Sequence, residues 1–239
     1  THSFALALSL FAIYISAKGP NDSNTFGYFR AEILAAFING ITIALSVVWI
    51  IYEAITRLLH PEEILSQVTL IIAVVGLVVN LLTGYILLKA DQKNLNIRSA
   101  FLHMVTDAVS SVAIIIGAVI IYYTNLFIID TLIAFLVALL IAKWAYKLLK
   151  DSTHILLEGS PIDVRSVKKE IIEHFANVND VHDIHCWEMT NGYYYLMAHI
   201  VLNNTDEVSY DEAICQISKF LEERFSIGHT TLQIESGKF

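Results

Sequence analysis

Residues 100–123 read AFLHMVTDAVSSVAIIIGAVIIYY, a nearly unbroken apolar run that is long enough to cross the hydrocarbon core of a membrane as one helix. Two ionisable residues, His103 and Asp107, interrupt the run four positions apart. An aspartate at the centre of a membrane helix costs roughly 2.5–3.5 kcal/mol. Such residues face the interior of a helix bundle or a water-filled path, and they indicate ion or proton sites. The pair therefore indicates a membrane protein, and it marks the candidate ion or proton site.

Four further apolar stretches accompany this run. Together the five cover about residues 3–17, 31–55, 68–88, 100–123 and 128–149, so we expect five membrane helices. Because the chain opens inside an apolar stretch, we interpret it as a fragment of a six-span bundle whose first helix precedes residue 1. Basic residues concentrate at one side of the spans, which the positive-inside rule assigns to the cytoplasm. They are Lys18, Arg30, Lys89, Lys93, Arg98, Lys143, Lys147 and Lys150.

The composition changes after the fifth span. Hydrophobic residues make up 56% of the chain and charged residues 16%, and the net charge of −8 arises after residue 150. Helical periodicity over residues 163–175 and 210–225, with strand-like segments at 181–188, 193–202 and 230–235, predicts a small α+β domain of order α-β-β-α-β. Asn191-Gly192 signals a hairpin between the first two strands. We predict a membrane domain over residues 1–158 and a cytoplasmic domain over residues 159–239.

His103 and Asp107 carry side chains that bind divalent metals. Residues four apart share one helix face, about 6 Å apart along the axis. Imidazole nitrogen and carboxylate oxygen are both zinc ligands, but a tetrahedral ion needs two more. The alternative is a hydrogen-bonded pair with a purely structural role. His2, near the start of the first apolar stretch, is a further candidate ligand, and a frayed chain end is its alternative.

Four segments, taken in order, resemble the cation diffusion facilitator family. They are RAEILAAFING (residues 30–40), NLNIRSAFLHMVTDAVSSV (94–112), HILLEGSP (154–161) and VHDIHCW (181–187). The resemblance covers nearly the whole chain, from the family's second helix onward. It implies a zinc-type metal/proton antiporter with six spans and a cytoplasmic, metallochaperone-like (ferredoxin-like) α+β domain, usually assembled as a homodimer.

In the membrane, the resemblance implies a metal site shared by two helices. The His-x-x-x-Asp pair of the family's fifth helix matches His103 and Asp107. The second helix supplies a pair that ends in aspartate, and this aspartate falls at His2, while its partner falls before residue 1. Two carboxylates and two neutral imidazoles would neutralise Zn²⁺. A histidine at position 2 would leave one positive charge in a poorly screened place, unless the preceding partner is acidic. This departure bears on metal preference and proton stoichiometry.

In the cytoplasmic domain, the resemblance implies that His182 and His199 are metal ligands. Some relatives add a histidine and an acidic residue from the last strand, and Gln233 and Glu235 stand at those places here. Because glutamine is a poor zinc ligand, we expect incomplete occupancy of a binuclear site, with His229 as a possible replacement ligand. Polar residues without a metal role are the alternative for each of these positions. If side chains alternate strictly between the two faces of this strand, His182 and residue 186 share one face and residues 183 and 185 share the other.

These features predict a secondary transporter that exports Zn²⁺ from the cytosol in exchange for protons, with Cd²⁺ and Co²⁺ as further candidate ions. We expect a homodimer embedded in the lipid of a plasma or inner membrane, with zinc both transported and bound in the cytoplasmic domain. A metal-binding membrane scaffold or partner subunit that transports nothing is the alternative. We expect no enzymatic activity, because no nucleophile motif or second acid accompanies the pair. No basic stripe suggests a nucleic-acid partner.

Overall fold

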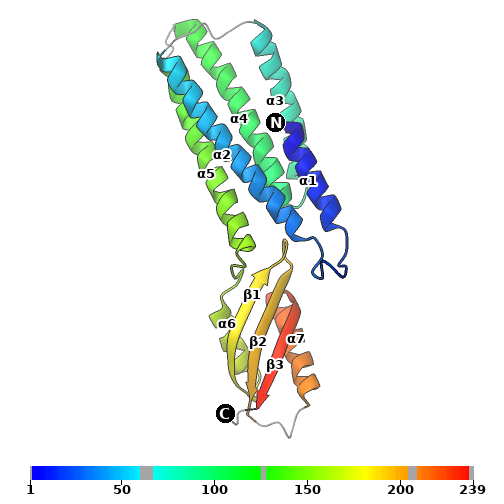
Figure 1. The fold of residues 1–239 in the computed structure, drawn as a ribbon. Helices are drawn as coiled ribbons and strands as arrows, with labels where there is room; N and C mark the ends of the chain where they lie inside the picture. Colours follow the sequence, from blue (N-terminus) through cyan, green and yellow to red (C-terminus); the bar gives the residue numbers. More distant parts are fainter. Residues whose placement is uncertain (1, 60–66, 125–127, 204–208, 237–239) are drawn as a thin grey trace. The chain divides into compact units, whose positions relative to one another are not determined.

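Two compact units divide the chain in the computed structural model, Thr1–Thr153 and His154–Phe239. The structure describes residues 2–59, 67–124, 128–203 and 209–236. The first unit is a bundle of long helices, and the second combines two helices with a three-stranded sheet (Figure 1). The predicted fold class, a helical membrane bundle followed by a small α+β domain, is confirmed.

The helices of the first unit occupy the five predicted places. They are α1 (His2–Ser16), α2 (Arg30–Leu59), α3 (Gln67–Leu88), α4 (Leu95–Thr124) and α5 (Ile128–Leu156). Within the described residues, three helical stretches are long and apolar enough to cross a membrane: Arg30–Thr56, Leu95–Gly117 and Thr131–Leu156. α1 and α3 contribute shorter apolar segments. Large apolar side chains are exposed along the bundle, Trp49 and Leu136 among them, as a surface in contact with lipid requires.

Helix α4 begins earlier than predicted, at Leu95 rather than at Ala100. The side-chain oxygen of Asn94 accepts hydrogen bonds from the backbone N–H groups of Asn96 and Ile97, at 2.9 and 3.2 Å. This is N-capping, which satisfies donors that the first helical turn leaves over. α5 likewise continues past its apolar run. An apolar run therefore marks the membrane-embedded part of a helix and not its ends.

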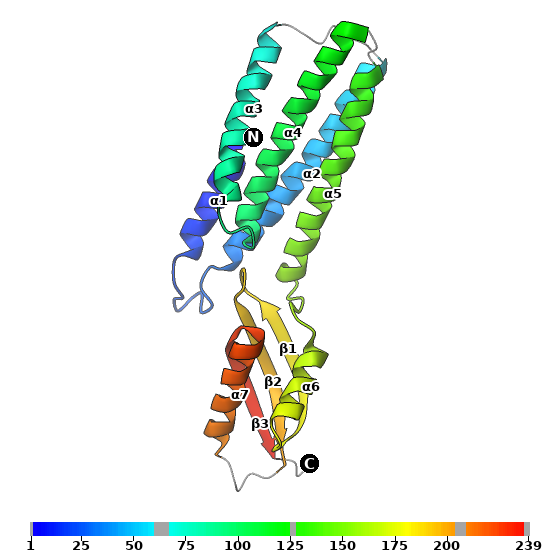
Figure 2. The same ribbon diagram turned by 180° about the vertical axis from the view of Figure 1, so that it is seen from behind.

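Helix α4 packs against α1, α2 and α3, and it runs beside α2 and α3 in both views (Figures 1 and 2). α2 and α5 approach closely at Gly40, where an added Cβ would stand 2.9 Å from Cδ2 of Leu149. A glycine allows this approach because it has no side chain. Arg98 and Asp151 form an ion pair of 3.3 Å between α4 and α5.

The sheet of the second unit has the order β1-β2-β3, formed by Val178–Glu188, Tyr194–Leu202 and Ile227–Ser236. β1 and β2 are antiparallel, and β2 and β3 are parallel. Helices α6 (Val164–His174) and α7 (Tyr210–Phe225) both cover one face of the sheet, as Figure 2 shows. The chain order is the predicted α-β-β-α-β. We call the opposite face, which no helix of the described part of this unit covers, the open face.

The core of this unit lies between the two helices and the covered face. It includes Val167, Ile171, Leu196, Ala198, Ile200, Leu202, Ile217 and Leu221, each at most 2% exposed. Burying a side chain such as leucine contributes about 1.5–3 kcal/mol. Alternate residues of β2 therefore point into this core, which leaves the intervening residues for the open face.

Local signals in the sequence explain the turns of the second unit. The predicted hairpin joins β1 to β2: Met189 N–H donates to the carbonyl of Tyr193 at 3.0 Å, and Gly192 has φ of 74°. Glycine adopts this left-handed conformation without steric cost. Asp163 caps α6, since its Oδ1 accepts from the backbone N–H of Arg165 at 3.1 Å.

Candidate metal sites

His103 and Asp107 lie one turn apart on α4, with 3.4 Å between His103 Nε2 and Asp107 Oδ2. Helical geometry alone brings them together, as their spacing predicts. The His103 ring is 3% exposed and the Asp107 carboxyl 23%. Because three neighbouring helices pack against α4, the histidine faces the bundle interior and not lipid.

This pair, which we call the helix pair, offers one imidazole nitrogen and one carboxylate to a divalent ion. A tetrahedral zinc ion needs two further ligands. The predicted additional ligand, His2, belongs to α1, and α1 contacts α4. The side chain of His2 lies outside what the structure describes, so its role as a ligand stays a prediction.

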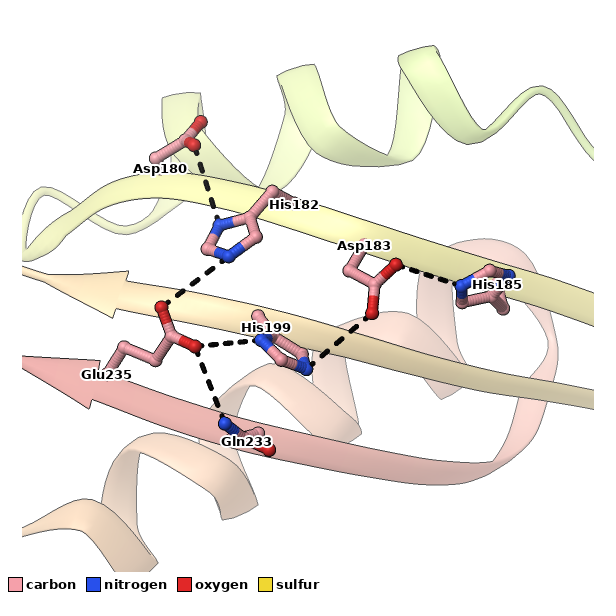
Figure 3. A network of polar contacts seen from close by, with 7 residues as sticks. All are labelled: Asp180, His182, Asp183, His185, His199, Gln233 and Glu235. Atoms are coloured by element: carbon pink, nitrogen blue, oxygen red, sulfur yellow. Dashed lines mark hydrogen bonds and ion pairs between the residues drawn. The ribbon is translucent and has the colours of Figure 1, made fainter.

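A second group of possible ligands spans all three strands on the open face (Figure 3). Glu235 of β3 stands between two histidines: its Oε2 is 3.5 Å from Nε2 of His182, and its Oε1 is 2.8 Å from Nδ1 of His199. The two rings have centroids 5.2 Å apart. Potential ligand atoms of all three residues lie within 4.8 Å of one another. The structure thus assembles three predicted site residues, which we call the strand cluster.

The strand cluster suits a metal ion that approaches from the open face. Zinc binds histidine nitrogen and carboxylate oxygen at about 2.0–2.2 Å, which places tetrahedral ligand atoms about 3.3 Å apart. A small closure of the three side chains would reach that spacing. Asp183 stands on the other side of the His199 ring: its Oδ2 lies 3.7 Å from Nε2, whereas Glu235 lies at Nδ1, and its Oδ1 lies 3.0 Å from Nε2 of His185.

Asp183 reaches this position because β1 contains an irregularity. The pairing register shifts between His182 and His185, and Asp183 has φ of 50°. This is a β-bulge, in which one extra residue re-aims its neighbours. Aspartate tolerates the left-handed conformation better than most residues. As a result His182 and His185 are both exposed, while Cys186 is buried opposite Leu196. The predicted grouping of positions 182 and 186 on one face is wrong.

Cys186 belongs to the core and not to the metal ligands. It is 4% exposed. Burial raises the pKa of the Cys186 thiol to about 11, although a hydrogen bond with Ser160 acts in the opposite direction. Zinc binds the thiolate, which is scarce at neutral pH when the pKa is this high. The other cysteine, Cys215, is exposed on α7.

The remaining candidates on β3 have other neighbours. His229 lies opposite Tyr195, with ring centroids 4.7 Å apart. It stands several residues along the sheet from the strand cluster, so it does not replace a ligand there. Gln233 Nε2 donates to Oε1 of Glu235 at 3.4 Å. This contact is long beside the 2.8 Å contact of the same oxygen with His199.

A charged residue on α6 pairs with Asp180, a carboxylate beside the strand cluster. Lys168 Nζ lies 2.7 Å from Oδ1 of Asp180, and this hydrogen bond lowers the pKa of the Asp180 carboxyl. The other carboxylate oxygen, Oδ2, lies 3.7 Å from Nδ1 of His182. A carboxylate at this ring nitrogen leaves Nε2 available to a metal, the arrangement in which metal-bound histidines are usually held.

A bundle of apolar helices followed by a small α+β unit indicates an integral membrane protein. The family model of the cation efflux transmembrane domain matches residues 1–157, and that of the cytoplasmic domain of cation efflux proteins matches residues 160–237. The chain therefore belongs to the cation efflux family, the cation diffusion facilitators.

Curated relatives match almost the whole chain. A cadmium, cobalt and zinc/H⁺-K⁺ antiporter of Bacillus subtilis is 38% identical over 238 residues, which are 98% of this chain and 76% of the relative. The zinc transporter ZitB of Yersinia pestis is 35% identical over 238 residues, 98% of this chain and 75% of the relative. The metal cation efflux system protein CzcD of Cupriavidus metallidurans is 36% identical over 237 residues, 98% of this chain and 74% of the relative.

Proposed function

We propose that this chain is a secondary transporter that exports Zn²⁺, and also Cd²⁺ or Co²⁺, from the cytosol in exchange for protons. Membership of the cation efflux family and relatives named as zinc, cadmium and cobalt transporters support the export of metal. The single observation that carries the proposal is the helix pair. An imidazole and a carboxylate that lie one turn apart inside a membrane bundle have few roles other than ion or proton transfer.

Proton exchange follows from the chemistry of these ligands. A metal binds only deprotonated imidazole and carboxylate, so loading from the cytosol releases protons and an incoming proton helps to expel the metal. Helix bundles that rock around a fixed midplane site would expose it to each side in turn. His2 stands three residues before Ala5, a buried position of α1. We propose His2 as the ligand that α1 contributes.

We further propose that the strand cluster binds Zn²⁺ through His182, His199 and Glu235. The protein would act as a homodimer in a plasma or inner membrane, with residues 1–158 in the membrane and residues 159–239 in the cytoplasm. The description of the matched second model as a cytoplasmic domain supports this orientation. The concentration of basic residues at the corresponding ends of the spans also supports it.

The experiment that tests the proposed function measures Zn²⁺ flux in proteoliposomes with and without an imposed pH gradient. A transporter moves zinc into vesicles, and collapse of the gradient slows the movement. A metal-binding scaffold of the same fold would bind Zn²⁺ and give no flux that depends on the gradient. That second result would overturn the proposal.

A further inference from the structure

A buried polar network joins α1, α2 and α4. Nδ2 of Asn39 donates to the hydroxyl oxygens of Ser9 and Ser99, each at 3.2 Å. Nδ2 of Asn96 donates to the backbone carbonyl of Ser9 at 3.0 Å, and the Ser99 hydroxyl donates to the carbonyl of Asn96 at 2.7 Å. Both asparagines are 0% exposed. These four residues, which we call the amide network, lie inside the bundle.

The amide network leaves two strong acceptors unused. Among the described residues, Oδ1 of Asn39 and Oδ1 of Asn96 are buried and have no hydrogen-bond partner. Native structures rarely leave buried polar atoms in this state, because the lost hydration is not replaced. The two NH₂ groups already donate the hydrogen bonds that join the three helices. A network that served only to hold the helices together would need no further bonds. The amide oxygens take no part in these hydrogen bonds. A neutral amide oxygen is a weaker zinc ligand than imidazole or carboxylate, so it can contact a passing ion without retaining it.

The amide network lies on the same face of α4 as the helix pair. Asn96, Ser99, His103 and Asp107 follow one another at intervals of three and four residues, the spacing of one helix face. Ser99 is therefore one turn before His103, about 6 Å along the axis. The network and the helix pair are therefore separated by a single helical turn.

A carboxylate stands on the other side of the network. Glu32 precedes Asn39 by two helical turns on α2, which places both on one face. Its side chain is nearly buried, at 9% exposure, and its Oε2 accepts from Nδ2 of Asn94 at 2.7 Å. The Glu32 carboxylate, the amide network and the helix pair therefore form a series of oxygen-bearing groups. The series runs from the first turns of α2 and α4 to the helix pair.

We infer that Asn39 and Asn96 form a station for a divalent cation between Glu32 and the helix pair. At this station the ion exchanges water for amide and hydroxyl oxygens before it reaches His103. The inference rests on the proposed function, whose orientation puts these ends of α2 and α4 in the cytoplasm. Neutral oxygen ligands hold an ion weakly, as transit requires, because a passing ion must also be able to leave.

The test compares Asn39→Ala and Asn39→Asp with the unaltered chain in Zn²⁺ flux and in calorimetric Zn²⁺ binding. For Asn39→Ala we expect the KM for zinc on the cytoplasmic side to rise about tenfold, at the lower end of the loss that follows removal of a group supporting a metal site. Binding at the helix pair should not change. For Asn39→Asp we expect tighter binding and slower turnover, because a carboxylate holds the ion at the station.

Asn80→Ala is the matched control, since Asn80 is a buried amide of α3 outside the network. It should leave KM and affinity unchanged. A KM for Asn39→Ala equal to that of the control would overturn the inference. So would lower thermal stability in Asn39→Asp without a gain in zinc affinity, the result that a purely structural network gives. Failure of the unaltered chain to transport zinc would instead count against the proposed function, and the calorimetric comparison would still decide the inference.

Discussion

The helix pair and the strand cluster reach similar ligand chemistry by different routes. On α4, four residues of sequence bring His103 and Asp107 to 3.4 Å, with regular backbone throughout. In the sheet, the ligands come from three strands, and β1 needs a bulge with Asp183 at φ of 50° to place its side chains. His103 of the helix pair is 3% exposed, whereas His182 of the strand cluster is 44% exposed on the open face. The first arrangement suits an ion in transit, and the second suits an ion in equilibrium with solvent.

The largest effect is expected at the helix pair. Asp107→Ala is best studied in a chain that also carries Glu235→Ala, which removes binding at the strand cluster. There it should weaken the remaining Zn²⁺ binding at least about 100-fold. Loss of a residue that only hydrogen-bonds to a metal ligand already lowers metal affinity about 10–100-fold. Calorimetric titration measures the change. Ser110→Ala is the control, since that hydroxyl donates to the Thr106 carbonyl of its own helix. The dimer should assemble in each case. An unchanged isotherm for Asp107→Ala would remove the helix pair from the metal site.

The strand cluster should respond as a separate site that stabilises its own unit. Zinc at 100 times its Kd adds about 2.7 kcal/mol to the stability of a domain that binds it only when folded. Glu235→Ala should abolish most of this gain, and Glu223→Ala, on the exposed side of α7, should keep it. Thermal unfolding of the whole chain with and without Zn²⁺ measures both. The gain should also shrink as the pH falls, because protons compete for the imidazoles. Equal zinc stabilisation in the two variants would contradict the assignment.

The bulge provides a smaller and separable effect. Asp183→Val places a β-branched side chain at φ of 50°, which should destabilise the second unit by about 1–3 kcal/mol. Asp183→Asn should retain nearly full stability, because asparagine adopts this conformation readily. Denaturant unfolding without metal distinguishes the two variants, and equal stability would mean that the bulge is not strained.

The smallest effect is expected at the pair of Lys168 with Asp180, both of which are more than 40% exposed. Lys168→Ala should cost about 0.2–1 kcal/mol at pH 7, as is usual for exposed ion pairs. Because the folded-state pKa of Asp180 is lowered, this contribution is present above the unfolded-state pKa and is lost as the pH falls through the folded value. The difference in stability between the two chains should therefore vanish in acid. A difference that persists at low pH would indicate a packing role for Lys168.

The sequence allowed more of the bundle than of the sheet to be predicted. Apolar runs located all five helices, and the spacing of His103 and Asp107 located their contact, because helical geometry depends on local sequence alone. The start of α4 was missed, although Asn94 carried the capping signal. The parallel pairing of β2 with β3 depends on contacts between residues far apart in sequence, so it could not be derived from any one segment.

Prediction of the strand cluster depended on family resemblance. No local pattern brings His182, His199 and Glu235 together, since each comes from a different strand. Strict alternation misplaced Cys186, because the sequence of β1 does not announce its bulge. The amide network was equally hidden. Asn39 was visible as a polar residue in an apolar run, but its partners lie on two other helices.

Zinc flux and internal pH, recorded together in proteoliposomes for the unaltered chain, Asp107→Ala and Glu235→Ala, test the central claim most directly. The account predicts that zinc entry is coupled to proton exit in the unaltered chain. Glu235→Ala should keep both fluxes, and Asp107→Ala should lose both. Continued exchange of zinc for protons by Asp107→Ala would contradict the claim that His103 and Asp107 hold the transported ion.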